Sequence, residues 1–202
     1  DAECPHCDVV TGSDTIREKI HDGKFRYSVY GVNYQTPDGS NHFRAGSEID
    51  EKGMEMARER VDSDFGMIDF LAEPYPGGHT DRVANYGVEQ WRDVFTPRQL
   101  VAHYEYLQAY KIFKPKINDK YESKKADAIL TLLALGASRM VSFNSRLSTW
   151  HDQRGNVANI FSSNNFVLKK MFADNNLSAQ RLGYLKRMEQ VLDSYEDLVS
   201  YT

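Results

Sequence analysis

Cys4 and Cys7 are the residues whose type and spacing most clearly predict chemistry, because two thiolates separated by two residues can hold one tetrahedral zinc ion. A zinc ribbon needs a second pair of ligands, and this sequence has no further cysteine. We therefore predict half of a zinc ribbon, with two idle loop cysteines as the alternative. Other residues near the pair carry ligand atoms but lack the spacing of a second pair: His6, Asp8, His21 and His42.

The Cys-Pro-His-Cys sequence at residues 4–7 is also what a thiol oxidoreductase of the thioredoxin class would carry. That fold needs a strand before the motif and a helix after it. Only three residues precede Cys4, and residues 8–12 do not open a helix. The surroundings of the pair therefore favour a metal site over redox catalysis.

No motif of a self-contained enzyme is visible in the sequence. Methyl transfer to a base amine would need a glycine-rich turn for the cofactor, and an acid or amide, two prolines and an aromatic residue beside the base. Residues 73–75 (Glu-Pro-Tyr) and 164–166 (Asn-Asn-Phe) are only near misses. A phosphate-binding glycine loop, a helical His-Glu zinc motif and a serine nucleophile elbow are also missing. We predict no catalytic residue in this chain.

Arg92 and Arg98 lie at the clearest helix start in the sequence, Thr-Pro-Arg-Gln at residues 96–99. The free N–H groups at a helix entrance favour anions, so both arginines are candidate contacts to nucleic-acid phosphates. The alternative is structural: Trp91 and Phe95 are buried and staple the helix, while Arg92 pairs with a nearby aspartate.

A second candidate cluster lies in a polar connection between predicted helices and contains Arg146, Trp150, Arg154 and Asn159. The arginines could contact phosphates while Trp150 stacks on a base, as in nucleic-acid grooves. A structural loop held by its asparagine side chains is the alternative.

Charge is unevenly distributed along the 202 residues, although the net charge is only -4. Residues 1–80 carry -8 and residues 81–202 carry +4, and within the second part residues 98–187 reach +9. Such a segment could face a polyanion such as DNA, or it could be a set of solvated lysine faces on amphipathic helices. Folding decides whether these charges converge.

The remaining bulk properties of the sequence limit the classes of protein to which the chain could belong. No apolar run approaches the roughly 20 residues that cross a bilayer, which predicts no membrane partner. Two closely spaced cysteines favour a reducing compartment, and we expect a cytoplasmic location. Residue 1 is Asp and no secretory signal follows it, so we expect the chain to begin inside a longer protein.

The element pattern predicts an α+β fold that is mostly helical, with two domains. Residues 1–80 should hold the half zinc ribbon, a β-hairpin over about 25–44 and a helix capped by Asp50; breaks at 73–79 mark the boundary. Residues 81–202 should form an irregular bundle of about four helices. We place these at 96–114, ended by Lys114 and Pro115, at 124–143, at 163–172, and from a cap at Ser178 onward.

The last predicted helix carries apolar residues at alternating spacings of three and four. This is the spacing of a helix–helix seam, which serves equally well as a bundle edge or as a contact in a homodimer. The residues of this seam are Leu185, Met188, Leu192, Tyr195 and Val199. In the helix at 124–143, small residues such as Gly136 would let a neighbouring helix approach closely.

A series of motifs, taken in order, resembles a known family. The series is Gly78-His79-Thr80-Asp81, Asn85-Tyr86-Gly87, the run from Trp91 to Leu100, Phe143-Asn144-Ser145, Trp150 and Asn159-Ile160-Phe161. It resembles the middle of the adenine-specific DNA methylases that contain a zinc ribbon. The resemblance covers about residues 77–165 and, less closely, the two cysteines.

The resemblance implies a large bacterial or archaeal enzyme whose glycine motif for S-adenosylmethionine precedes this segment and whose Asp-Pro-Pro-Tyr motif follows it. This chain would then be the insert between them. Cys4 and Cys7 would match the second of two Cys-x-x-Cys pairs, and S-adenosylmethionine would bind elsewhere in the parent protein.

We therefore expect a non-catalytic insert of a DNA amino-methyltransferase that positions DNA or recognises its target, with DNA and the rest of the methylase as partners. A structural or assembly domain, which braces the methylase halves or dimerises through the last helix, is the alternative. The candidate nucleic-acid contacts are Arg92, Arg98, Arg146, Trp150, Arg154 and Asn159.

Overall fold

The computed structural model describes residues 1–4, 6–22, 26–77, 83–162, 168–169, 171–179 and 182–201. Over these residues the chain is α+β and mostly helical, which confirms the predicted fold class. The helices are α1 (Ser13–His21), α2 (Glu48–Ser63), α3 (Phe65–Ile68), α4 (Pro97–Lys120), α5 (Ser123–Val141) and α6 (Tyr184–Ser200). Short 3₁₀ helices lie at Ala84–Tyr86, Trp91–Val94, Asp152–Arg154 and Ile160–Ser162.

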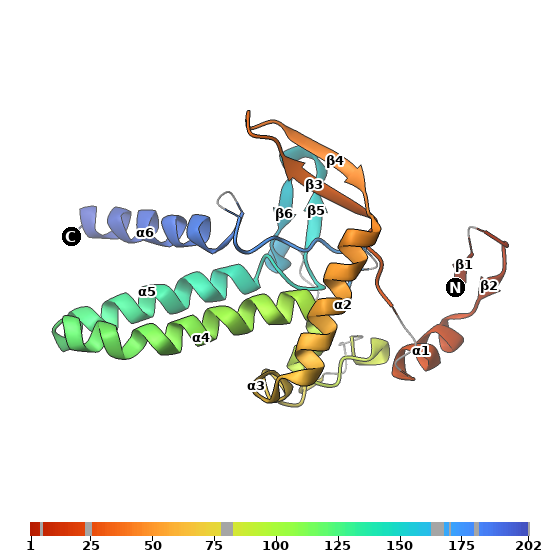
Figure 1. The fold of residues 1–202 in the computed structure, drawn as a ribbon, viewed down its shortest axis with the longest axis horizontal. Helices are drawn as coiled ribbons and strands as arrows, with labels where there is room; N and C mark the ends of the chain where they lie inside the picture. Colours follow the sequence, from red (N-terminus) through yellow and green to blue (C-terminus); the bar gives the residue numbers. More distant parts are fainter. Residues whose placement is uncertain are drawn as a thin grey trace.

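The strands form small antiparallel pairs. They are β1 (Ala2–Glu3) with β2 (Val10–Thr11), β3 (Gly31–Gln35) with β4 (Asn41–Ala45), and β5 (Thr149–His151) with β6 (Asn156–Ala158). Hairpin β3–β4 meets β5 through an edge-on contact between Phe43 and Trp150, whose ring centroids are 5.8 Å apart. Hairpins β3–β4 and β5–β6 therefore lie together at one side of the molecule, whereas β1–β2 lies apart from them beside α1 (Figure 1).

Three long helices, α4, α5 and α6, extend side by side to one end of the molecule, with α5 packed against both of the others (Figure 1). We call this unit the helical arm. The turn between α4 and α5 and the C-terminal end of α6 lie together at its outer end (Figure 1). In the described part of the chain, no helix is both long and apolar enough to cross a membrane.

The hydrophobic core lies at the base of the arm, where α2 crosses α4. Residues from before and after residue 80, the predicted domain boundary, contribute side chains to this core. The division of the chain into two domains at residue 80 stays a prediction. Burying these side chains supplies the main stabilisation of the fold, at about 1.5–3 kcal/mol for each large one. The buried members are Val61, Met67, Val83, Val88, Val94, Phe95, Leu100 and Leu147.

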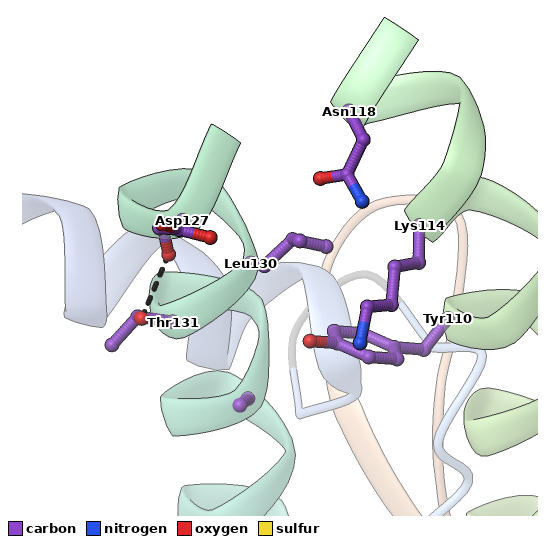
Figure 2. A pocket seen from close by; sticks show the side chains of 7 residues that line it. Tyr110, Lys114, Asn118, Asp127, Leu130 and Thr131 are labelled. Atoms are coloured by element: carbon purple, nitrogen blue, oxygen red, sulfur yellow. Dashed lines mark hydrogen bonds between the residues drawn. The ribbon is translucent and has the colours of Figure 1, made fainter. Parts of the chain in front are cut away.

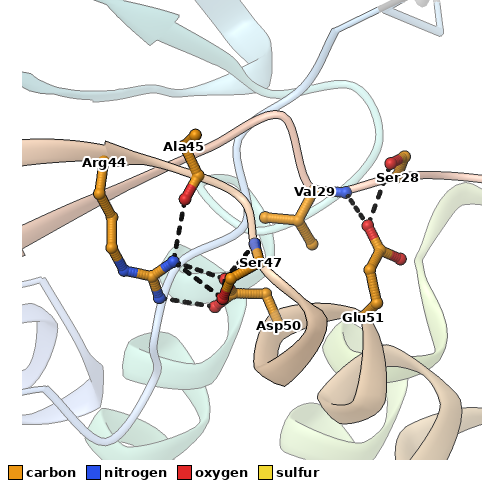
Figure 3. Close-up of polar contacts among 7 residues, drawn as sticks. All are labelled: Ser28, Val29, Arg44, Ala45, Ser47, Asp50 and Glu51. Atoms are coloured by element: carbon orange, nitrogen blue, oxygen red, sulfur yellow. Dashed lines mark hydrogen bonds and ion pairs between the residues drawn. The ribbon is translucent and has the colours of Figure 1, made fainter.

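Polar contacts at the start of α2 connect hairpin β3–β4 to the helix (Figure 3). The Asp50 carboxylate accepts two hydrogen bonds from the Arg44 guanidinium, at 2.6 and 2.8 Å, and one from the Ser47 backbone N–H at 2.9 Å. Ser47 is therefore the N-cap and Asp50 completes a capping box, so the predicted cap at Asp50 was wrong.

The predicted β-hairpin began too early. Strand β3 starts at Gly31, and residue 25 lies outside the described residues. Residues 26–30 do not form a strand, because Val29 N–H and the Ser28 hydroxyl donate to the Glu51 carboxylate of α2, at 2.8 and 3.0 Å (Figure 3). Aromatic and β-branched composition alone does not reveal this side-chain acceptor.

The first helix of the arm runs past the predicted end at Lys114 and Pro115, and α4 continues to Lys120. Proline inside a helix removes one N–H and frees the carbonyl of the residue four positions earlier. Lys111 and Pro115 are both exposed, so water can reach this part of the helix. The helix is weakened there rather than ended.

The later helices of the arm follow the predicted spacing, but α6 begins late. Gly136 of α5 meets Met188 of α6 so closely that an added Cβ would lie 2.0 Å from the Met188 sulfur, which confirms the packing role of this small residue.

The predicted N-cap of the last helix, Ser178, instead donates its hydroxyl to Asn176 at 2.7 Å, and α6 starts after Gly183. The predicted helix at 163–172 lies largely outside the described residues, and residues 168–169 and 171–179 are not helical.

Candidate nucleic-acid interface

Arg92 and Arg146 are both engaged with backbone carbonyl groups. The Arg92 guanidinium donates to the Ile68 carbonyl, and that of Arg146 donates to the Asp93 carbonyl. Arg146 also lies over the Tyr27 ring, 5.0 Å from its centroid, and burial lowers its pKa. These contacts favour structural roles for both arginines, and their predicted contacts with DNA remain a prediction.

Arg98, at the start of α4, lies beside Asp174, with 3.6 Å between its Nε and the carboxylate. The Asp174 side chain is only 20% exposed. Burial raises the pKa of Asp174 from 3.8 to about 6, although the positive charge of Arg98 opposes this shift. Arg98 therefore has a partner within the chain, and its charge is partly committed to it.

Trp150, Arg154 and Asn159 lie on or beside hairpin β5–β6. Trp150 is half-buried against Phe43, and the Asn159 Oδ1 is buried with no hydrogen-bond donor among the described residues. Arg154 is exposed and has no ion pair in the part of the chain that the structure describes. Of the six candidate contacts, Arg154 is the one whose charge faces solvent without a partner.

The six predicted residues come from two regions of the fold. Arg92, Arg98 and Arg146 lie around the base of the arm, whereas Trp150, Arg154 and Asn159 belong to the region of β5 and β6. The helix entrance and the polar connection meet at Arg146, whose backbone N–H donates to the Val94 carbonyl at 2.8 Å and whose guanidinium donates to the Asp93 carbonyl. The second contact uses a guanidinium donor instead of presenting it to solvent.

A cluster of lysines lies at the outer end of the arm. Residues 111–125 contain six lysines and two acidic residues, a net charge of +4. All six are exposed, and within the described residues none lies within 4 Å of a carboxylate. We call this cluster the lysine tip: Lys111, Lys114, Lys116, Lys120, Lys124 and Lys125.

Aromatic and apolar residues accompany the lysine tip. Lys116 Nζ lies 5.0 Å from the centroid of Phe113, and Lys125 Nζ lies 5.0 Å from that of Tyr121. Phe113 is 54% exposed and Ile112 is 59% exposed. Exposed rings between lysines are typical of surfaces that bind nucleic acid, because bases stack on rings while ammonium groups meet phosphates.

An open cavity of about 410 Å³ lies between α4 and α5 beside the lysine tip (Figure 2). Lys114 and Asn118 point into it from α4, and Leu130 faces them from α5 (Figure 2). Tyr110 and Thr131 add hydroxyl groups to its wall. The Thr131 hydroxyl donates to the Asp127 carbonyl at 2.7 Å, and Asp127 itself also lines the cavity. The cavity therefore offers an ammonium group, an amide and the Tyr110 hydroxyl as donors suited to a phosphate oxygen, beside one carboxylate that opposes an anion.

Cys4 and Cys7 lie at the turn of hairpin β1–β2. Cys4 N–H donates to the Val9 carbonyl at 3.0 Å, and Asp8 N–H donates to the Cys4 carbonyl at 2.9 Å. The backbone N–H of His6, and then the side chain and N–H of Cys7, lower the pKa of the Cys4 thiol. A thiolate favoured in this way suits a metal ligand.

The two thiols supply only half of a tetrahedral zinc site. Among the described residues, no group of three or more His, Cys, Asp or Glu side chains gathers to hold a metal ion. The donor set therefore fits a pair of zinc ligands and does not form a complete site.

His103 was missed by sequence reasoning, and it joins α4 to α6. Its Nε2 lies 3.1 Å from the Asn144 carbonyl, so this nitrogen carries the proton, and its Nδ1 accepts from the Tyr184 hydroxyl at 2.9 Å. Burial lowers the pKa of His103. Tyr106 stacks on Tyr184 with 4.2 Å between ring centroids. These contacts fix the direction in which the arm leaves the core.

Comparisons with known proteins add no relative. No model of a known protein family matches the chain, and no curated protein and no solved structure is significantly similar to it. The family resemblance therefore rests on the sequence motifs alone.

Proposed function

We propose that this chain positions DNA for a larger S-adenosylmethionine-dependent DNA amino-methyltransferase, and that it does so through the lysine tip. The observation that carries this proposal is a projecting helical hairpin whose end presents six exposed lysines without acidic partners in the described part of the chain. Lysines that bind phosphates release the counterions condensed on DNA, and this release drives association.

The lysine tip replaces Arg92 and Arg146 as the principal contact surface in this proposal. Those two guanidinium groups already donate to backbone carbonyls, and breaking such bonds would oppose DNA binding. Arg154 remains a candidate for a second, weaker contact because it is exposed.

Methyl transfer itself is assigned to other parts of the parent methylase in this proposal. The sequence carries neither the glycine-rich cofactor turn nor the proline-containing catalytic motif that the chemistry needs. DNA in a prokaryotic cell lies in the cytoplasm, and we place the protein there.

Zinc is proposed as a structural ion shared between Cys4 and Cys7 and a second ligand pair supplied by the parent protein. The lowered pKa of the Cys4 thiol supports this role. The ion would fix the N-terminal hairpin and would take no part in methyl transfer.

DNA binding by the full chain tests the proposal. We would titrate a fluorescent duplex at several salt concentrations and compare the wild type with the double variant Lys116→Ala/Lys120→Ala. Losing two phosphate contacts should weaken binding and reduce the slope of log affinity against log salt by about 1 to 2. The matched control is Lys19→Ala/Lys52→Ala, which removes two exposed lysines far along the chain from the tip.

Two results would contradict the proposal. Duplex binding that is absent at low salt would remove DNA as the ligand. Equal losses in the tip variant and the control variant would show that net charge, and not the tip, attracts DNA. Calorimetric titration with S-adenosylmethionine tests the division of labour, because binding to this chain would place the cofactor site here.

The alternative function, assembly without nucleic-acid affinity, is favoured by a separate observation. Several apolar residues of α6 are exposed, among them Leu185, Leu192 and Val199. Exposed apolar patches of this kind mark contacts with another protein.

A further inference from the structure

The predicted seam on α6 is mostly uncovered in the described chain. Met188 packs against Gly136, but the exposed fractions of Leu185, Leu192 and Tyr195 are 66%, 43% and 49%, and that of Val199 is 52%. Their spacing of seven residues, with intermediate steps of three and four, places them along one stripe of the helix. A stripe of this length is suited to another helix.

The outer part of α6 is acidic. From residue 188 to residue 200 the helix has four acidic residues and no basic one, and Glu189 is paired with Lys186 at 2.8 Å. Asp193, Glu196 and Asp197 have no ion pair within 4 Å in the part of the chain described. A helix that covers the stripe should therefore carry lysine or arginine beside its apolar residues.

The lysine tip has the complementary composition. Its net charge of +4 lies beside the exposed Ile112 and Phe113, as the acidic residues of α6 lie beside Leu192 and Val199. Each surface therefore combines unpaired charges of one sign with exposed apolar side chains, and the two signs are opposite.

The arrangement of the arm allows a symmetrical exchange of these surfaces. The lysine tip and the C-terminal end of α6 lie at the same end of the arm, on either side of α5 (Figure 1). A two-fold axis along the arm would place α6 of each copy beside α4 of the other. Both contacts form at once and the assembly closes as a dimer. Direct pairing of α6 with α6 would instead bring acidic residues together.

We propose that a second copy of this chain covers the α6 stripe, with its lysine tip against Asp193, Glu196 and Asp197 in a reciprocal dimer. This inference goes beyond the proposed function and does not depend on DNA binding. The same lysines are proposed to bind DNA and to contact the second copy, so the lysine tip is covered in the dimer.

Sedimentation of the full chain over a range of concentrations at low salt tests this dimer. The wild type should dimerise. Reversing the acidic charges with Glu196→Lys/Asp197→Lys, or the basic ones with Lys116→Glu/Lys120→Glu, should each shift the dissociation constant upward by tenfold or more. Combining both pairs should restore dimerisation, because the attraction returns with opposite sign. Circular dichroism confirms that each variant is folded.

The control is Glu59→Lys/Asp62→Lys, which reverses two exposed charges on α2 and should leave the dimer unchanged. A wild type that remains monomeric throughout overturns the proposal. A dimer that survives the α6 reversal, or one that the combined variant does not restore, overturns this pairing of surfaces. The Glu196→Lys/Asp197→Lys variant keeps its lysine tip, so failure of the dimer is distinguished from failure of DNA binding.

Discussion

Arg146 and Arg154 show how the surroundings of a guanidinium decide its role. Arg146 is half-buried, donates to the Asp93 carbonyl and lies over the Tyr27 ring, whereas Arg154 projects into solvent. A buried carbonyl that loses a charged donor is left unsatisfied, and this costs about 1–3 kcal/mol.

We therefore expect Arg146→Met, which keeps much of the apolar stem, to lower the free energy of unfolding by about 1–3 kcal/mol. Arg154→Ala, the control, should change it by less than about 0.5 kcal/mol, as is usual at exposed positions. Urea denaturation followed by circular dichroism measures both values. Equal stability of the two variants would show that the Arg146 contact contributes nothing.

Asp174 gives the fold a dependence on pH. Its folded pKa of about 6 exceeds the ordinary value of 3.8 because the carboxyl is buried. Between these two values the native state holds a proton that the unfolded state has lost, so stability falls as the pH rises through this window.

Asp174→Asn lacks this titration, and the stability of the wild type relative to it should fall by about 1–3 kcal/mol between pH 4 and pH 7. Denaturation of both proteins across this range provides the measurement, and other groups cancel in the difference. In a background with Asp174 intact, Arg98→Gln should extend the upper end of the window to higher pH, since the opposing positive charge is removed and the unfolded pKa is unchanged. A constant difference would show that Asp174 titrates as an ordinary carboxyl.

At the residue scale, the sequence identified arginine side chains that make hydrogen bonds, but it did not identify the acceptors of those hydrogen bonds. The partners of Arg92 and Arg146 are main-chain carbonyls, which every residue has and no motif reveals. His103 escaped notice because a single histidine on an apolar helix face has no spacing to recognise.

At the scale of elements, junctions determine the arrangement more than the interiors of helices do. Gly46 stands between β4 and α2, where an added Cβ would lie 1.6 Å from the Val29 carbonyl oxygen. Gly53 lies within α2, where an added Cβ would meet nothing within 4 Å. The same substitution should therefore have opposite effects at these two positions.

Gly46→Ala should destabilise the fold by at least about 1–3 kcal/mol, because backbone atoms must move apart to accommodate the methyl group. Gly53→Ala should stabilise it by about 0.5–1 kcal/mol, since alanine is the better helix former and the site is open. Thermal unfolding of both variants distinguishes these effects. If Gly46→Ala were tolerated, the close approach of Val29 would be wrong.

Pro115 weakens the outer half of α4, and its replacement should strengthen the hairpin that presents the lysines. Pro115→Ala restores a backbone donor within the helix and should raise stability by about 1–3 kcal/mol. The helical signal in circular dichroism should rise with it. Pro97→Ala is the control, because proline is well tolerated at the first position of a helix. An unchanged melting temperature for Pro115→Ala would show that the outer turns of α4 are not coupled to the fold.

Sequence spacing located α5 closely, at 124–143 against Ser123–Val141, because a long apolar helix has an unambiguous period. The same approach predicted too early an end for α4, because proline usually ends a helix. An exposed helix can nevertheless continue past proline, as α4 does at Pro115. That error hid the lysine tip: Lys116 and Lys120 were left outside any helix.

At the scale of the whole molecule, the basic segment of the sequence forms the lysine tip because the chain turns between α4 and α5. The +9 segment was visible in the sequence, but lysines from two helices meet only because the chain reverses at residues 121–122. The acidic outer part of α6 reaches the same end from another direction (Figure 1). Such convergence depends on helix lengths and packing partners, which local patterns do not contain.

The two proposals together predict that DNA and self-association compete for the lysine tip. Leu192→Gln/Val199→Gln removes exposed apolar contacts of α6 without changing charge, so it should weaken the dimer and leave the lysines intact. At protein concentrations where the wild type is dimeric, this variant should bind a duplex more tightly, and added duplex should convert wild-type dimer into a complex of one chain with DNA. Sedimentation with a fluorescent duplex measures both species. A duplex that binds the intact dimer would show that the tip remains free in the dimer, which contradicts the reciprocal pairing while leaving the DNA-binding role in place.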